Sequence, residues 1–425
     1  MNGIMIQGTS SGSGKSFIVT GLCRLLTDIG LNVCPFKSQN MSNNSYTTHD
    51  GLEISTAQAV QAYSARLMPE AFMNPILLKP RHEQSSEVIL NGKVYSPTTE
   101  GYREFSQTIG IDAVRKALRH IRGNFEAVII EGAGSPAEIN LNATEIVNMR
   151  IAREADVPVI LVADVDRGGS LASVAGTLEL LGHDRERVKG IIFNMFRGDM
   201  ALFRDAVTWT ENYTGVKVIG VVPFIKSVNI PDEDSLNLTE YHSDAPRGIT
   251  IGILKFPNIA NFSEFSPFAH ESDVSTIYVD ENIAVSKLHC FDAVILPDTN
   301  NITEAGKWLY SSGIGEFLRG FEGFIFGTGG GFGLLSDNVG GCFCFDGRKG
   351  ENVPNDFRVS GTNFNRIFSN DNFRTMWLNS IRRSKNCGEH GITDTRTAND
   401  NSYNEIARIL SQCLDIEYIL RLICS

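Results

Sequence analysis

The sequence predicts an α/β fold in which a P-loop doubly wound parallel sheet is followed by a second α/β unit. Short apolar runs rich in β-branched residues, typical of buried parallel strands, recur through the first 235 residues. Longer segments with apolar residues three and four positions apart, typical of helices, separate these runs. The first run leads directly into a glycine-rich loop. The predicted strands are residues 4–7, 33–36, 127–130, 157–163, 190–193 and 218–222, and the predicted helices include 17–26, 111–121 and 170–181.

The glycine-rich loop after the first predicted strand has the composition of a nucleotide-phosphate site. It consists of Gly8, Thr9, Ser10, Ser11, Gly12, Ser13 and Gly14, and it leads into Lys15 and Ser16. Glycines allow backbone N–H groups to turn toward phosphate oxygens, the lysine can reach the outer phosphates, and the serine hydroxyl is suited to Mg²⁺. Five residues separate Gly8 from Gly14, one more than in the usual pattern. We therefore predict that the chain binds ATP.

Composition narrows the class of protein. The chain has 425 residues, of which 42% are apolar and 20% are charged, as expected for a globular protein of two or three domains. A net charge of −11 argues against general binding of nucleic acid. The eight cysteines are scattered, and we identify neither a signal peptide nor a membrane span, so we expect a cytoplasmic protein without disulfides.

Polar and charged residues follow four predicted strands, at the sheet edge where ligands of doubly wound folds bind. An acidic side chain at the tip of a buried strand is costly unless a cation or hydrogen bonds receive it. Glu131 is therefore the predicted second ligand of Mg²⁺ beside Ser16, with a capping role as the alternative. The residues that follow the four strands are Lys37 and 39–44; Glu131; Asp164, Asp166, Arg167, Gly168 and Gly169; and Asn194 and Asp199.

Further side chains could contribute to phosphoryl transfer and to nucleotide recognition. Lys37, Lys79 and Arg167 are cations that could stabilise a phosphoryl group in its transition state, although each alone could be a surface charge. Asn194 and Asp199 follow a strand at a place where many nucleotide enzymes recognise the base. A polar turn between a strand and a helix would contain the same residues, so both interpretations stay open.

Five strings of residues resemble those of the cobyric acid synthase family. They are KSQNMSNN at 37–44, NPILLKP at 74–80, IEGAGSPAEINL at 130–141, DVDRGG at 164–169 and FRGD at 196–199. The resemblance extends over nearly all of the first 240 residues and more loosely to the end of the chain. It implies a P-loop domain of the dethiobiotin synthetase type. It also implies ATP-dependent amidation of the b, d, e and g carboxylates of adenosylcobyrinic acid a,c-diamide, through acyl phosphates.

The resemblance also implies roles for individual residues. Lys15, Lys37, Glu131 and Arg167 would form the catalytic group. Mg²⁺ on Ser16 and Glu131 would help to spread the charge of the phosphoryl step. The corrinoid substrate would lie against a larger set, which consists of Gln39, Asn40, Ser42, Asn43, Asn44, Lys79, Asp166, Gly168 and Gly169.

The second α/β unit is predicted from strands at 249–254, 292–296 and 323–326. The family has a flavodoxin-like class I glutamine amidotransferase domain here, whose cysteine and histidine release ammonia from glutamine. In this chain Gly329 stands at the cysteine position and Asn365 at the histidine position. Neither can perform covalent glutamine hydrolysis, so we expect this half-reaction to be lost. Cys342 and Cys344 are each followed by phenylalanine and lack the glycine that an elbow needs after its cysteine, and strands after the elbow are expected to be missing.

The predicted boundaries are 1–235 for the synthetase domain, 236–248 for a linker, 249–385 for the degenerate amidotransferase-like domain, and 386–425 for a loop and an amphipathic helix. Ser402 to Glu405 has the pattern of a capping box that would start this helix.

Several alternatives stay open. Ammonia would come from solution or from a separate glutaminase, and self-association is not decided. A catalytically inactive relative that binds nucleotide or corrin, and a two-site cobyrinic acid a,c-diamide synthase, are the other candidate functions. A partitioning ATPase is disfavoured because such proteins carry an additional lysine where this chain has Gln7, Gly8 and Thr9.

Overall fold

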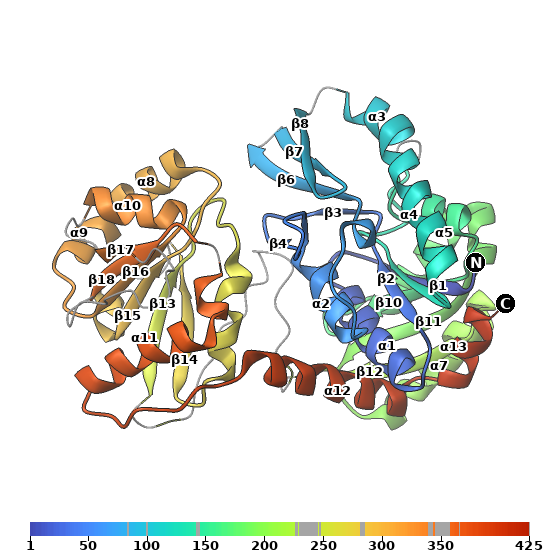
Figure 1. The fold of residues 1–425 in the computed structure, drawn as a ribbon. Coiled ribbons are helices and arrows are strands. Elements are labelled where there is room, and N and C mark those ends of the chain that lie inside the picture. The colour runs from blue at the N-terminus through green and yellow to red at the C-terminus, as the bar shows by residue number, and fades with distance from the viewer. Residues whose placement is uncertain are drawn as a thin grey trace. The chain divides into compact units, whose positions relative to one another are not determined.

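A computed structural model describes residues 1–82, 85–98, 101–141, 145–225, 228, 245, 248–280, 285–338, 343–344, 358–364 and 366–424. The chain divides into two compact units (Figure 1). The first unit contains Met1–Ile230 together with Asp400–Ser425, and the second contains Pro231–Asn399. The C-terminal residues therefore return to the unit that carries the P-loop.

The first unit is built on a six-stranded parallel sheet with the order β12-β11-β10-β1-β9-β2. Its central strands are almost completely buried, which explains their continuous apolar sequences. Every strand predicted for this sheet is present, and the predicted doubly wound fold is confirmed. The strands are β1 (Gly3–Gly8), β2 (Val33–Phe36), β9 (Ala127–Glu131), β10 (Val159–Asp164), β11 (Val188–Phe196) and β12 (Val218–Pro223).

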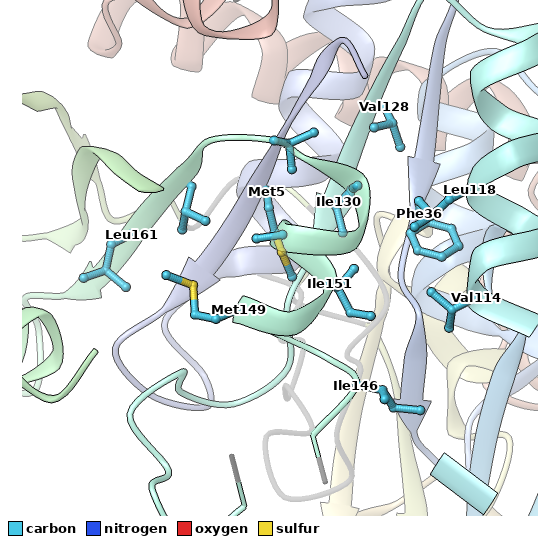
Figure 2. Packing of buried hydrophobic residues seen from close by; sticks show 14 of the residues in the cluster. Met5, Phe36, Val114, Leu118, Val128, Ile130, Ile146, Met149, Ile151 and Leu161 are labelled. Atoms are coloured by element: carbon cyan, nitrogen blue, oxygen red, sulfur yellow. The ribbon is translucent and has the colours of Figure 1, made fainter. Parts of the chain in front are cut away.

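Helices cover both faces of this sheet because its strands point apolar side chains to both sides. Met5, Ile130 and Leu161 point to one face, where they pack with side chains of α4 and α5 (Figure 2). Side chains of α6 belong to the same cluster. The neighbouring Ile4 and Ile6 belong to the opposite cluster, which contains α1 and the C-terminal helices. The helices that connect the strands of this sheet are α1 (Lys15–Asp28), α4 (Ile111–Asn124), α5 (Met149–Ala155), α6 (Ser170–Leu180) and α7 (Met200–Thr214).

Elements between β2 and α4 were not predicted. A four-stranded sheet has the order β3-β6-β7-β8, and a separate hairpin joins β4 to β5. These elements and the loops between them contain part of the set predicted to face the corrinoid, namely Gln39, Asn40, Ser42, Asn43, Asn44 and Lys79. Their bounds are β3 (Gln39–Met41), β4 (Ser45–Thr47), β5 (Glu53–Ser55), α2 (Thr56–Ser64), β6 (Ile76–His82), β7 (Ser85–Leu90), β8 (Lys93–Thr98) and α3 (Tyr102–Phe105).

The second unit contains a six-stranded parallel sheet with the order β14-β13-β15-β16-β18-β17. The order of its first four strands is that of flavodoxin-like folds. The sequence led us to expect that strands after the elbow are missing. In the structure β17 and β18 follow the elbow and extend the sheet, and the loss of further strands stays a prediction. The elements are β13 (Ile249–Leu254), β14 (Val274–Val279), β15 (Ala293–Leu296), α8 (Ile302–Ser311), α9 (Ile314–Arg319), β16 (Phe324–Thr328), α10 (Gly330–Asn338), β17 (Phe343–Cys344), β18 (Val359–Thr362) and α11 (Asp371–Ser384).

The C-terminal residues form α12 (Thr395–Cys413) and α13 (Ile416–Ile423). The predicted capping box at Ser402 is wrong, because the helix starts earlier and Asp394 accepts the backbone N–H groups of Arg396 and Thr397. The later part of α12 packs closely on α1: a Cβ atom on Gly21 would lie 2.4 Å from Leu410. Among the described residues, no helix has the length and apolar character needed to cross a lipid bilayer.

Candidate active site

The P-loop connects β1 to the N-terminus of α1. Gly14 precedes the helix with a φ of 87°, and a Cβ atom there would lie 2.0 Å from Nδ2 of Asn194, so this position requires glycine. In the described part of the chain, no side chain caps the N-terminus of α1 and its first turn has no acidic residue. The first N–H groups of α1 and the positive end of the helix dipole are therefore suited to bind an anion.

Lys15 is held over this loop. Its Nζ donates to the carbonyl oxygens of Ser10 at 3.1 Å and Gly134 at 3.2 Å, and only 7% of the residue is exposed. Gly134 belongs to the segment that follows β9, so the lysine joins the P-loop to the neighbouring strand end. Both acceptors are neutral carbonyl groups, which a phosphate could replace as partners of the ammonium group.

Glu131 lies at the centre of a buried group of polar side chains at the end of β9. Its carboxylate is completely buried, and Oε1 accepts from Ser16 Oγ and from Lys37 Nζ, both at 2.8 Å. Oε2 accepts from Nε2 of Gln61. The structure thus joins three residues that the sequence assigned to one site. Gln61 was missed, because nothing in the sequence distinguishes it from other polar residues of α2 that are also buried, such as Gln58 and Ser64.

The loop predicted to face the corrinoid is largely engaged with the protein. Asn40 is 4% exposed and Asn44 is 1% exposed. Nδ2 of Asn40 donates to Ser55 Oγ at 2.6 Å, and Ser42 Oγ accepts the backbone N–H of Asn44 at 3.0 Å. In this conformation, the buried residues Asn40 and Asn44 stabilise the loop.

Other residues of the predicted corrinoid set are more accessible. Gln39 is half-buried and accepts a hydrogen bond from the hydroxyl group of Tyr102, and Asn43 is also half-buried. Lys79 forms an ion pair with Glu53. A contact of these side chains with a corrinoid stays a prediction.

A second polar group follows β10 and β11. Asp166 donates its backbone N–H to Asp164 Oδ1 at 2.8 Å, and its carboxylate pairs with Arg197 at 2.8 Å. Arg167 pairs with Asp164 at 3.3 Å, and its guanidinium group lies 3.4 Å from where a Cβ atom on Gly12 would be. Arg167 is therefore adjacent to the P-loop. The turn then continues through Gly168 and Gly169, both with positive φ, into α6.

Asn194 and Asp199 have local partners. Nδ2 of Asn194 donates to the carbonyl oxygen of Ser13 at 2.9 Å, so this buried amide stabilises the P-loop. Asp199 caps α7 by accepting the backbone N–H of Ala201 at 2.8 Å. The sequence left two interpretations of Asp199 open, a polar turn between a strand and a helix or a role in base recognition. The structure contains the polar turn.

The second unit has a sharp turn between β16 and α10. Gly329 occupies this elbow with a φ of +50°. The carboxylate of Asp298 lies against it and accepts the backbone N–H of Gly330 at 2.8 Å. Asn365, aligned with the family histidine, lies outside the described residues, as does Cys342, whereas Cys344 is exposed.

Comparison with known proteins adds to this geometry. The family model of the CobQ/CobB/MinD/ParA nucleotide binding domain matches residues 4–238. A cobyric acid synthase of Geobacillus sp. (strain WCH70) is 35% identical over 489 residues, which covers 98% of this chain and 96% of the relative. This chain belongs to the cobyric acid synthase family.

Two further members of the cobyric acid synthase family show the same likeness over less of their length. The cobyric acid synthase of Chloroflexus aggregans is 41% identical over 82% of this chain and 71% of the relative. The probable cobyric acid synthase of Methanothermobacter thermautotrophicus is 40% identical over 79% of this chain and 67% of the relative. The Geobacillus alignment, at 489 residues, is longer than this chain of 425, so that relative contains residues without a counterpart here.

Proposed function

We propose that this chain is an ATP-dependent amide ligase that converts the b, d, e and g carboxylates of adenosylcobyrinic acid a,c-diamide to amides, and that it takes its ammonia from outside its own second unit. The observation that carries the proposal is the group around Glu131. Ser16 from the P-loop helix and Lys37 from the end of β2 both reach one carboxylate oxygen of Glu131. Membership of the cobyric acid synthase family supports the same chemistry.

The residues at this site fit a magnesium ion. Mg²⁺ prefers oxygen ligands and is usually held by one or two protein groups together with water and phosphate oxygens. Ser16 and Glu131 supply a hydroxyl and a carboxylate oxygen that lie 2.8 Å apart. Among the described residues there is no group of three or more acidic, histidine or cysteine side chains that could hold a metal ion, which is compatible with a metal held largely by the nucleotide. Bound there, Mg²⁺ would neutralise charge that develops on the phosphate oxygens.

A carboxylate is a poor acylating agent, so the reaction would proceed in two displacements. A carboxylate oxygen of the corrinoid attacks the γ-phosphorus of ATP, the bond to the β,γ-bridging oxygen breaks, and ADP leaves. Ammonia then attacks the acyl carbon, loses a proton, and expels inorganic phosphate. Lys15 and Arg167, both next to the P-loop, would stabilise charge during the first displacement, which depends mainly on positioning and electrostatics.

Lys37 would also act at this step. Its ammonium group is buried and paired with Glu131, so it provides a fixed positive charge that needs no reorganisation when the phosphoryl group moves. Asn194 would hold the P-loop in place through the carbonyl oxygen of Ser13.

The sequence of the second unit supports an external source of nitrogen. Gly329 has no nucleophile, and an amide at position 365 cannot accept a proton from a thiol near neutral pH. We therefore infer that free ammonia, or ammonia from a separate glutaminase, serves as the donor.

One assay tests the proposal. The purified chain is incubated with ATP, Mg²⁺ and adenosylcobyrinic acid a,c-diamide, in parallel with ammonium chloride and with glutamine, and the products are analysed by mass. We expect amides with ammonium chloride and neither amides nor glutamate with glutamine. Release of glutamate would refute the inferred loss of glutaminase activity. Nucleotide binding without any amide in excess ammonium would instead favour a catalytically inactive relative.

A further inference from the structure

Gln61, which no predicted site includes, contacts the carboxylate proposed to hold magnesium. It lies on α2 and is completely buried. Its Nε2 donates to Oε2 of Glu131, whereas Oε1 of that carboxylate accepts from Ser16 and Lys37. Each carboxylate oxygen of Glu131 is thus held by its own donors, and the donor on Oε2 comes from an element outside the P-loop and the central sheet.

We propose that Gln61 is a positioning residue that orients Glu131 and thereby sets the affinity for the magnesium–nucleotide complex. The proposal rests on the proposed function, in which Ser16 and Glu131 hold the metal. The terminal torsion of a glutamate side chain has a broad energy profile, so Glu131 needs hydrogen bonds to fix the direction of its oxygens. Without the bond from Gln61, Oε2 would have no donor among the residues that the structure describes, and only the bonds to Oε1 would orient the carboxylate.

A neutral amide is suited to this role. Lys37 already pairs with Glu131, and a second cation would further reduce the negative charge that attracts a metal. The amide N–H of Gln61 fixes the carboxylate without adding charge. Hydrogen bonds to metal-binding side chains typically change metal affinity tenfold to a hundredfold.

The oxygen atom of the Gln61 amide indicates that this residue does more than fill space in the core. Its Oε1 is buried and accepts no hydrogen bond among the described residues. An unsatisfied buried acceptor is unfavourable, whereas an apolar side chain of similar size would fill the same space without that penalty. The amide is explained by what its N–H group does, which is to hold Glu131.

Helix α2 is itself tied down at both ends. Its N-cap Ser55 accepts the backbone N–H of Ala57 at 3.3 Å and is bonded to Asn40 of β3. Near its C-terminus, Ser64 Oγ donates to the carbonyl oxygen of Thr20 in α1 at 2.5 Å. Because α2 is fixed in this way, Gln61 can hold Glu131 at a constant position relative to the P-loop helix.

The test measures metal-dependent nucleotide binding rather than turnover. The full chain is titrated with AMP-PNP, a non-hydrolysable ATP analogue, by calorimetry in excess Mg²⁺ and in EDTA. We expect Gln61→Met to bind AMP-PNP at least tenfold more weakly than the wild type in Mg²⁺ and equally well in EDTA. Gln61→Asn keeps the amide but is one methylene too short, so we expect the same pattern. Tyr63→Phe is the control: it removes an exposed hydroxyl group of the same helix, which is hydrogen-bonded to that of Tyr46, and should keep the full response to Mg²⁺.

The outcomes are distinguishable. A wild-type response to Mg²⁺ in both Gln61 variants would overturn the positioning role. Equal losses in Mg²⁺ and in EDTA would also overturn it, because they indicate a general structural role, and thermal unfolding would identify a variant that fails to fold. If the wild-type chain itself binds AMP-PNP equally well with and without Mg²⁺, the magnesium site of the proposed function is wrong and this inference fails with it.

Discussion

The carboxylate of Asp298 fills the space that a side chain at Gly329 would need. A Cβ atom built on Gly329 would lie 2.4 Å from Oδ1 and 2.5 Å from Cγ of Asp298. Asp298 is held there by the backbone N–H groups of Gly330 and Thr299, at 2.8 and 2.9 Å, and by the amide of Asn261 at 3.0 Å. With Asp298 in this position, the turn between β16 and α10 has no room for a side chain at position 329.

Gly329→Cys should therefore not be sufficient to produce glutaminase activity. We expect no glutamate from glutamine and a loss of stability of about 2 kcal/mol, because the new side chain collides with Asp298 and the positive φ disfavours it. In the background of Asp298→Gly, the same change should cost at least about 1 kcal/mol less. Urea unfolding of the four proteins in this cycle measures the coupling, and strictly additive costs would contradict the collision.

The ion pair between Lys37 and Glu131 should matter for folding as well as for catalysis. Lys37→Met leaves a buried carboxylate without its cation, so we expect a loss of about 3 kcal/mol or more. Adding Glu131→Gln removes the uncompensated charge and should recover part of that stability while amide formation stays undetectable. Urea unfolding and the ammonium-dependent assay measure the two effects separately. Equal stability of the single and double variants would show that the charge is not the cause.

The contact between α12 and α1 includes a buried arginine. Arg24 is completely buried and pairs with Asp400, and among the described residues its Nε and Nη1 have no hydrogen-bond partner. We expect Asp400→Ala to cost about 2 kcal/mol, less than for a fully buried pair because Asp400 is half-exposed. Glu405→Ala breaks an exposed pair with Arg408 on the same helix and should cost less than about 0.5 kcal/mol. Thermal unfolding compares the two, and similar shifts would contradict the role assigned to burial.

The second unit should lose stability as the pH rises from 5 to 8. Burial raises the pKa of Glu264 to about 7 from an ordinary value of 4.5, although the hydroxyl of Thr328 and the backbone N–H of Arg366 oppose the shift by donating to the carboxylate. The folded chain thus keeps a proton that the unfolded chain has already released between these two pKa values. The stabilisation is full below pH 4.5 and is lost through pH 7, a change of about 3 kcal/mol.

Glu264→Gln cannot ionise and should remove this dependence. The Thr328 hydroxyl can accept a hydrogen bond as well as donate one, so an amide can be accommodated at this position. Urea unfolding at pH 5 and at pH 8 gives the difference for each protein. An unchanged slope in Glu264→Gln would show that other groups cause the pH dependence.

The strands of the first central sheet, and β13, β15 and β16 of the second, could be predicted because most of their residues are buried, whereas β14, β17 and β18 were not predicted. Residues 33–36 and 249–254 coincide with β2 and β13. The sheet from β3 to β8 was not predicted, since its strands are short or carry polar residues, as Gln39–Met41 shows. Their pairing depends on partners distant in the chain, for which local periodicity contains no signal.

The first residue of α12 could not be predicted from the sequence for a different reason. Its apolar face was recognised, but Asp394 and not Ser402 caps it, because several polar residues within one stretch satisfy the capping pattern equally well. Which of them starts the helix depends on where the preceding chain is held. Arg374, buried in the second unit, contributes by donating to the carbonyl oxygen of Thr393.

The amino-acid sequence by itself predicted the P-loop, assigned Ser16 and Glu131 to one site, and showed that position 329 is a glycine. These features depend on residue type and on neighbours along the chain, or on the meeting of parallel strand ends at one sheet edge. Only the tertiary structure decided that Gln61 contacts Glu131 and that Asp298 occupies the space beside Gly329. Those contacts join segments far apart in the sequence, and the packing of whole helices and strands sets the distance between them.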